Sequence, residues 1–175
     1  MMSTAQLVSH GKDTLGLLND SQIIAIKKYT SISHAEINDP MREGRMPAGE
    51  FGQSARILSE TIQKHGTLPL PVKVFRGITS DAPEKVIESF KSGETVELKG
   101  FVSTSASRAV ADLEFGIKRD GGILFEITAT KGLYAGLRKL STRPHEKELI
   151  IDNNSKFRVT KVDSENFVIH MEQVG

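Results

Sequence analysis

The sequence predicts an α+β domain, because helical patterns fill its first 66 residues and strand patterns fill most of residues 67–175. A length of 175 residues is enough for one domain with a buried core. Apolar residues make up 38% of the chain and charged residues 26%, which is typical of a soluble globular fold. The best linker candidate, "HGTLPLPV", is only a short joint between the two halves, so a single domain over residues 1–175 is expected.

Four segments in the first part show helical periodicity: residues 3–18, 19–31, 33–43 and 51–66. Gly11 interrupts the apolar stripe of the first segment. Asp20 or Ser21 is the expected N-cap of the second segment. The third is expected to be a short helix or a turn, because Pro40 disrupts it. The fourth stops at Gly66, a residue typical of helix C-termini.

The period changes to that of strands after the joint. Strands are predicted within seven segments: 72–77, 94–105, 122–130, 132–140, 146–152, 156–162 and 167–174. Two short helices are predicted between them, at 82–93 and 107–116. Pro83 near the first turn and Gly93 past the end favour the first of these helices. The last two strands alternate around the polar sequence "DSEN", which predicts a hairpin.

The composition excludes several kinds of function. The absence of cysteine excludes disulfides, cysteine nucleophiles and thiolate metal sites. The five histidines form no i, i+4 pair, so no metal site is expected. A formal net charge of +1 without a long basic run does not imply nucleic-acid binding. The chain has no secretory signal pattern and no apolar run of about 18 residues, so no membrane segment is expected and its location stays open.

Three short polar stretches accompany the predicted strands. Arg76 and Gly77 end one strand, residues 103–105 (Ser-Thr-Ser) end another, and Glu146 and Glu148 begin a third. In a strand, residues i and i+2 share a face, so the two glutamates would lie side by side, where like charges repel. Each stretch alone has a plain structural explanation: a strand end, a helix cap, or a solvated pair of glutamates.

Together, the three stretches follow an order of Arg, Ser-Thr-Ser and Glu-x-Glu that resembles the arginine-type mono-ADP-ribosyltransferases. This family includes binary actin-modifying toxins and phage transferases. The segment "AIKKYTSISHAEINDPMR" looks like the helical segment of the family, and "EKELIIDNNSKFRVTKVD" resembles its acidic motif and closing hairpin. The resemblance covers residues 20–175, which is nearly the whole chain.

The resemblance implies two roughly perpendicular, mostly antiparallel sheets that form an NAD cleft, with the N-terminal helices over one side. It implies an enzyme that breaks the bond between nicotinamide and ribose in NAD and transfers ADP-ribose to an arginine side chain of a target protein. NAD would be the co-substrate, and no metal is implied. NAD hydrolysis and transfer to another acceptor, such as nucleic acid, stay open as alternatives.

The resemblance also implies roles for the residues of the three motifs. Glu148 would stabilise the oxocarbenium-like transition state, and Ser103 would orient this carboxylate. Glu146 would align the guanidinium of the acceptor and assist its loss of a proton. Arg76 would hold the pyrophosphate of NAD through its bidentate fork. Gly77 would let the backbone approach the nicotinamide amide closely.

Other NAD contacts are expected from residues around this centre: Thr104, Ser105, Phe115, Asn38 and Arg42. Phe115 would pack on nicotinamide, although an aromatic residue fits a core position equally well. Lys118 or Arg119 would lie near a phosphate. The family can carry a second arginine where Gly77 stands, so Arg42 is expected to take part in phosphate binding. Tyr29 would line the cleft or pack between helices.

The turn before the acidic motif is expected to meet the acceptor protein. Actin-modifying members usually carry an aromatic residue there, whereas this chain has Arg143 and Pro144. This departure argues against actin as the target. It makes Arg143 a candidate for substrate binding beside Glu146.

Two other functional classes fit the sequence less well. A binding module that kept only the fold could have lost Arg76, Ser103 or Glu148, and all three are present. A glycoside hydrolase needs carboxylates on separate elements about 5–9.5 Å apart, and the chain offers no tryptophan and only two tyrosines as sugar platforms.

We expect a monomer that acts in the cytoplasm of a host or target cell. Its partners would be a target protein that bears an arginine and, for a toxin, a delivery partner or domain.

Overall fold

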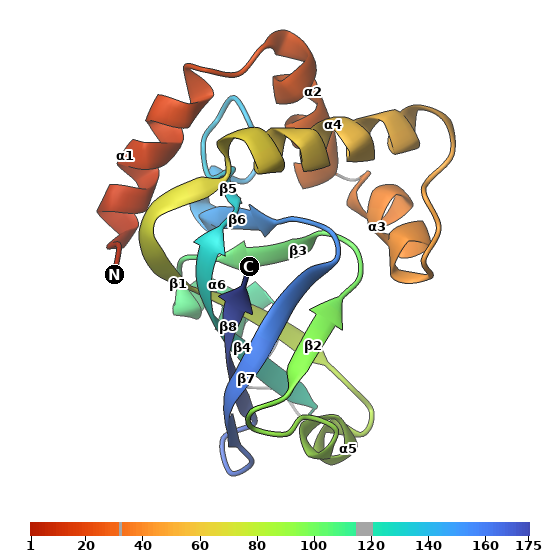
Figure 1. Cartoon of the computed structure of the whole chain (residues 1–175), viewed down its shortest axis with the longest axis vertical. Coiled ribbons are helices and arrows are strands. Elements are labelled where there is room, and N and C mark those ends of the chain that lie inside the picture. The colour runs from red at the N-terminus through yellow and green to blue at the C-terminus, as the bar shows by residue number, and fades with distance from the viewer. Residues whose placement is uncertain (32, 115–120) are drawn as a thin grey trace.

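Helices precede most of the strands along the chain, as the computed structural model of residues 1–31, 33–114 and 121–175 shows (Figure 1). The helices are α1 (Thr4–Leu15), α2 (Asp20–Thr30), α3 (His34–Arg42), α4 (Gly49–His65), α5 (Pro83–Glu88), α6 (Arg108–Glu114) and the 3-10 turn η1 (Pro144–Glu146). The strands are β1 (Thr67–Thr79), β2 (Thr95–Leu98), β3 (Val102–Ser105), β4 (Gly122–Lys131), β5 (Leu133–Tyr134), β6 (Glu148–Ile151), β7 (Ser155–Asp163) and β8 (Val168–Val174). The predicted α+β class and the final hairpin, β7–β8, are confirmed.

The eight strands form one hydrogen-bonded order, β2-β7-β8-β4-β1-β3-β6-β5. Neighbouring strands run antiparallel except β4 and β8, which are parallel. Among the described residues, β1 and β3 share one register pair, Phe75 with Ser105. In Figure 1, β3 and β6 run across the view, while β4, β7 and β8 run along it. The two groups of strands are thus joined by hydrogen bonds into one sheet, where the resemblance implied two.

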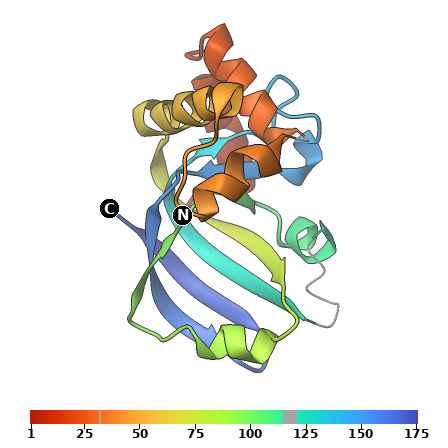
Figure 2. The ribbon, with the colours of Figure 1, turned by 90° about the vertical axis from the view of Figure 1, so that its right-hand side faces the viewer.

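The first four helices stand over one end of the strands (Figures 1 and 2). In Figure 2, α5 crosses the opposite end of the sheet and α6 lies to one side, where it contacts β1 and β3. In the described part of the chain, no helix is long and apolar enough to cross a membrane.

Two apolar clusters hold β6 from both sides. Leu149 and Ile151 pack into the core of the sheet, with Ile127 and Val159. Ile150 packs into a second cluster with residues of α2, α3 and α4. All three β6 side chains are fully buried. A strand that is buried on both faces has little freedom to move, so Glu148 at its first position is held firmly.

The capping prediction for α2 is wrong by one residue. Asn19 is the N-cap, and its side chain accepts from the backbone N–H of Gln22 at 2.9 Å, while the side chain of Gln22 accepts from the N–H of Asn19 at 2.9 Å. This reciprocal capping box satisfies two donors at once, whereas Asp20 lies inside the first turn.

The expected disruption at Pro40 is also wrong, because α3 continues for two residues past it. A proline so near the end of a helix removes little of the hydrogen bonding.

The predicted strand over residues 132–140 is much shorter in the structure, because pairing is limited to β5 and the N–H of Ala135. A Cβ at Gly136 would lie 2.4 Å from the hydroxyl oxygen of Tyr134, so the chain turns here at a glycine that packs tightly against a ring. Turns then continue to η1. The predicted strand over 94–105 is also divided, because Gly100 has a φ of 81°, a conformation that favours glycine and ends the strand.

Candidate active site

A pocket of about 360 Å³ lies where α2 and α3 meet β3, η1 and the start of β6. Its lining includes Tyr29, His34, Ser103, Arg143, Glu146 and Glu148, and Thr104 and Ser105 add to the β3 wall. Residues of two of the three sequence motifs, Ser-Thr-Ser and Glu-x-Glu, therefore meet at one cavity.

The register of β3 and β6 explains why these motifs meet. Ser105 pairs with Glu148, and Ser103 pairs with Ile150. Cross-strand partners share a face of the sheet, and so do residues i and i+2. Ser103, Ser105 and Glu148 therefore lie on the face that Ile150 presents to the helices.

The two other hydroxyls of the β3 wall brace the backbone around the glutamates. Thr104 donates to the carbonyl of Leu149 at 2.8 Å. Ser105 donates to the carbonyl of Glu146 at 2.7 Å. Both bonds tie β3 to the segment that carries the two carboxylates, so their loss would loosen the pocket wall rather than remove a charge.

Glu148 has an unusual affinity for its proton. Burial raises its pKa from 4.5 to about 7, a hydrogen bond from Ser103 opposes this rise, and the charge of Glu146 adds to it. The positive charges of Arg143 and Arg76 lower the pKa of Glu148 by smaller amounts. This carboxyl therefore changes its charge near neutral pH and is sensitive to each of its neighbours.

Glu146 does not lie on the strand, contrary to the prediction from i, i+2 spacing. It ends the 3-10 turn η1, and Lys147 follows with a left-handed φ of 50° before β6 begins. Pro144 opens this turn, because its fixed φ suits the first position of a helix. Glu146 nevertheless lines the same pocket as Glu148. Its carboxylate lies 3.2 Å from Nε of Arg143.

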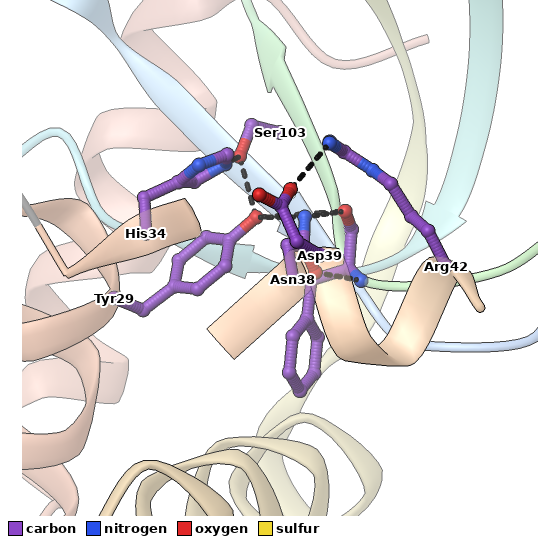
Figure 3. Close-up of polar contacts among 7 residues, drawn as sticks. Tyr29, His34, Asn38, Asp39, Arg42 and Ser103 are labelled. Atoms are coloured by element: carbon purple, nitrogen blue, oxygen red, sulfur yellow. Dashed lines mark hydrogen bonds and ion pairs between the residues drawn. The ribbon is translucent and has the colours of Figure 1, made fainter. Parts of the chain in front are cut away.

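A buried hydrogen-bond network links α2 and α3 to β3 (Figure 3). Asn38 holds the backbone of Phe101 from both sides: its amide donates to the carbonyl at 2.8 Å, and its oxygen accepts from the N–H at 2.8 Å. The amide of Asn38 also donates to the hydroxyl of Tyr29 at 3.3 Å. The Tyr29 hydroxyl lies 2.7 Å from Oγ of Ser103. The network therefore fixes the entry of β3 and the hydroxyl of Ser103 together.

The network is compatible with Ser103 donating its proton to Glu148. Burial, and then the charge of Glu148, raises the pKa of Tyr29, so this phenol keeps its proton. When Tyr29 accepts from Asn38, its own proton is available for the oxygen of Ser103. The proton of Ser103 is then available for Glu148, which agrees with the lowering of the Glu148 pKa by this serine.

Replacing Asn38 with alanine is expected to lower the free energy of unfolding by about 2–4 kcal/mol, because two buried backbone groups of Phe101 would lose their partner. Urea unfolding measures this change. Asp39→Ala is the matched control, since the adjacent side chain is 65% exposed and should change stability by about 0.5 kcal/mol or less. Equal losses in both variants would contradict the role given to Asn38.

Asn38 and Arg42, two residues predicted to contact NAD, lie outside the pocket lining within the described part of the chain. Asn38 is fully buried, and its amide groups bond to Phe101 and Tyr29. Arg42 lies on the same helix and pairs with Asp39 at 3.4 Å. Its positive charge reaches the site, because it helps to lower the pKa of His34.

Arg76 lies on β1, the neighbour of β3 in the sheet, and is not part of the pocket lining among the described residues. Its Nη1 donates to the carbonyl of Ser103 at 2.9 Å, and burial lowers its pKa. Gly77 continues β1 opposite Leu124, so no turn follows the arginine. The charge of Arg76 contributes to the field at Glu148.

His34 is a pocket residue that the sequence did not single out. Its Nε2 lies 3.5 Å from Oγ of Ser103, and its ring centroid lies 4.9 Å from that of Tyr29. Burial, followed by the charges of Arg42 and Arg76, lowers its pKa, which favours the neutral imidazole. The i, i+4 spacing of His34 and Asn38 was a usable signal, since it puts both residues on one face of a helix.

Two predicted contacts fall on residues outside the described part of the chain. These are the nicotinamide contact of Phe115 and the phosphate contact of Lys118 or Arg119. They stay predictions.

Comparison with known proteins agrees with this geometry. The family model "ADP-ribosyltransferase exoenzyme" matches residues 6–174. The "Putative NAD(+)--arginine ADP-ribosyltransferase Mav" of Mycobacterium avium (strain 104) is 31% identical over 81% of this chain and 16% of its own length. "Secreted exoenzyme S" of Pseudomonas aeruginosa is 27% identical over 85% of this chain and 31% of its own length. The chain thus spans less than a third of either relative.

Solved structures show the same fold. Plx2a, an ADP-ribosyltransferase toxin from Paenibacillus larvae, superposes with a TM-score of 0.77 at 16% identity, over 100% of both chains. Exoenzyme S from Pseudomonas aeruginosa, in complex with human 14-3-3 protein beta and bound to carba-NAD, gives a TM-score of 0.75 at 21% identity, over 95% of this chain and 82% of that one. The matched family uses NAD as its co-substrate, and this chain belongs to that family, the ADP-ribosyltransferase exoenzymes.

Proposed function

We propose that this chain transfers ADP-ribose from NAD to an arginine side chain of a target protein and releases nicotinamide. The observation that carries the proposal is the placement of Glu146 and Glu148 in one pocket, with different surroundings. Glu148 is held at the start of a buried strand, while Glu146 lies on a turn beside the exposed Arg143. The name of the relative Mav supports arginine as the acceptor.

Glu148 takes the role of stabilising the positive charge that develops on the ribose when nicotinamide leaves. A preorganised carboxylate acts on such charge without having to reorient at the moment of reaction. Ser103, held by Tyr29, orients this carboxylate. In its ionised form, Glu148 would also attract the cationic nicotinamide ring of bound NAD and accept hydrogen bonds from the hydroxyls of the adjoining ribose.

The positive charges around the pocket suit the other end of NAD. Arg76 and Arg42 provide the guanidinium groups for the pyrophosphate. The charges of both arginines act to lower the pKa values of the pocket residues Tyr29 and His34. The Gly77 backbone is assigned to the nicotinamide amide. Thr104 and Ser105 support NAD binding through the wall that they brace.

Glu146 is assigned to the acceptor. A carboxylate aligns an incoming guanidinium through charge-assisted hydrogen bonds and accepts the proton that the guanidinium loses. Arg143, on the rim beside it, is assigned to contacts with the target protein.

We also propose that the reaction takes place in the cytoplasm of a host or target cell, with delivery by a further domain or partner.

Transfer from labelled NAD to agmatine, a small guanidine, tests the proposed reaction. Wild-type protein should label agmatine, and Glu146→Gln should keep NAD cleavage but lose the labelling, because the amide cannot take the proton. Glu36→Gln, at an exposed position on α3, is the control and should label agmatine as wild type does. NAD cleavage without labelling by wild type would favour hydrolysis or a non-arginine acceptor. Full agmatine labelling by Glu146→Gln would overturn the role of Glu146.

A further inference from the structure

Arg143 already places a guanidinium against the carboxylate that is assigned to the acceptor. Its Nε lies 3.2 Å from Oε1 of Glu146, and both residues line the pocket together with Glu148. The side chain of Arg143 is 57% exposed, whereas that of Glu146 is 22% exposed. A side chain from the rim thus reaches a carboxylate inside the cavity.

The local backbone produces this contact. Arg143 directly precedes the 3-10 turn, and the N–H of Glu146 donates to its carbonyl at 3.1 Å. The N–H of Arg143 donates to Oγ of Ser141 at 3.0 Å, which anchors the other side of the residue. In this turn, residues i and i+3 come together on one side. The pairing of Arg143 with Glu146 is therefore a property of one short segment of the chain.

The ion pair is also easy to exchange. A pair with one partner this exposed is weak, so an external guanidinium can displace Arg143. Arg143 is close enough to Glu148 for its charge to lower the pKa of that carboxyl. It thus occupies the place of an acceptor arginine, next to both glutamates.

We propose that Arg143 is itself an acceptor, so that each molecule ADP-ribosylates its own Arg143 when no target arginine fills the site. This inference rests on the proposed function. The bond between the ribose C1 and the pyridinium nitrogen breaks, and its electron pair leaves with nicotinamide. A new bond forms between this C1 and a terminal guanidinium nitrogen of Arg143. The proton that this nitrogen loses passes to Glu146 and then to solvent.

Modification of Arg143 would have a consequence for the reaction. The product places a bulky, doubly anionic group on the rim of the pocket, next to Glu146. A modified molecule should therefore turn over agmatine more slowly than an unmodified one. External guanidines should protect Arg143, because they compete for the same carboxylate.

Peptide mass spectrometry after incubation with NAD alone tests the proposal. The expected result is one ADP-ribose on Arg143 in wild type, its loss in Glu148→Ala, and its suppression by excess agmatine. Arg143→Lys should lose the modification relative to the NAD that it cleaves in the same reaction, because lysine offers no guanidinium. Arg138→Lys, at an exposed arginine of the same segment, is the matched control and should keep it.

The outcomes separate this proposal from the proposed function. Wild type that labels agmatine but carries no ADP-ribose on Arg143 would overturn the inference and leave the arginine-directed reaction intact. Wild type that labels neither would fail the proposed function, and the inference with it. The rate of modification per molecule should not change on dilution. A rate that falls in proportion to protein concentration would show transfer between molecules and overturn modification within one chain.

Discussion

Glu148→Gln is expected to lower the kcat for NAD cleavage by about 10²–10³-fold, because it removes the preorganised charge that faces the ribose in the transition state. Glutamine keeps the size of the side chain and one of its acceptor oxygens, so the loss reports mainly on charge. Initial rates of nicotinamide release measure it. Glu60→Gln, at an exposed position on α4, is the control and should match wild type.

The same substitution should increase stability above neutral pH. The pKa of Glu148 in the folded chain is raised from 4.5 to about 7, so the folded state holds its proton more tightly than the unfolded state. The stability that this proton contributes is fully present below about pH 4.5 and is lost as pH rises through 7. Above that pH, the charged carboxylate costs roughly 3 kcal/mol, which the neutral glutamine avoids.

Urea unfolding of both proteins at pH 5 and pH 8 tests this trade between activity and stability. The difference in unfolding free energy between Glu148→Gln and wild type should be larger at pH 8. A difference that is the same at both pH values would contradict the raised pKa. Wild-type rates of NAD cleavage in the variant would contradict the role of the carboxylate.

The sequence was sufficient for those parts of the fold that follow from local pattern. Amphipathic periods predicted the first four helices, and Gly66 correctly marked the end of α4. Alternation predicted the hairpin of β7 and β8. The Ser-Thr-Ser and Glu-x-Glu motifs were expected near each other, and the pairing of Ser105 with Glu148 explains why they are.

The remaining features depend on contacts that no local pattern contains. Asn38 and Phe101 are 63 positions apart, and only the packing of α3 on β3 brings the amide to that backbone. The structure shows that Asn38 holds the backbone before β3. Its predicted contact with NAD stays a prediction. The turn at Glu146 has a local signal in the sequence, because Pro144 favours the start of a helix, whereas the i, i+2 spacing of the glutamates predicts a strand.

The pH dependence of NAD cleavage is expected to follow the ionisation of Glu148. Its carboxylate is the active form, so kcat/KM should fall about tenfold per pH unit below its pKa, which lies at about 7. The kcat/KM profile reports on the free enzyme, which is the state that the structure describes. His34 has a lowered pKa and should gain its charge at lower pH than this limb.

Two substitutions should move the acidic limb in opposite directions. Ser103→Ala removes the hydrogen bond that lowers the pKa of Glu148, so the limb should move to higher pH. Glu146→Gln removes the negative charge that raises this pKa, so the limb should move to lower pH. Both variants retain Glu148, and nicotinamide release can be followed in each without an acceptor.

The opposite signs are what make the test specific to Glu148. A general loosening of the pocket would admit water in both variants and lower the cost of charging a buried carboxylate, so both limbs would move to lower pH together. If the acidic limb belonged to another group, such as His34, it would disappear from the pH profile when that histidine was replaced. Shifts of the same sign in Ser103→Ala and Glu146→Gln would therefore contradict the assignment, whereas opposite shifts identify the titrating group as the carboxylate that lies between these two neighbours.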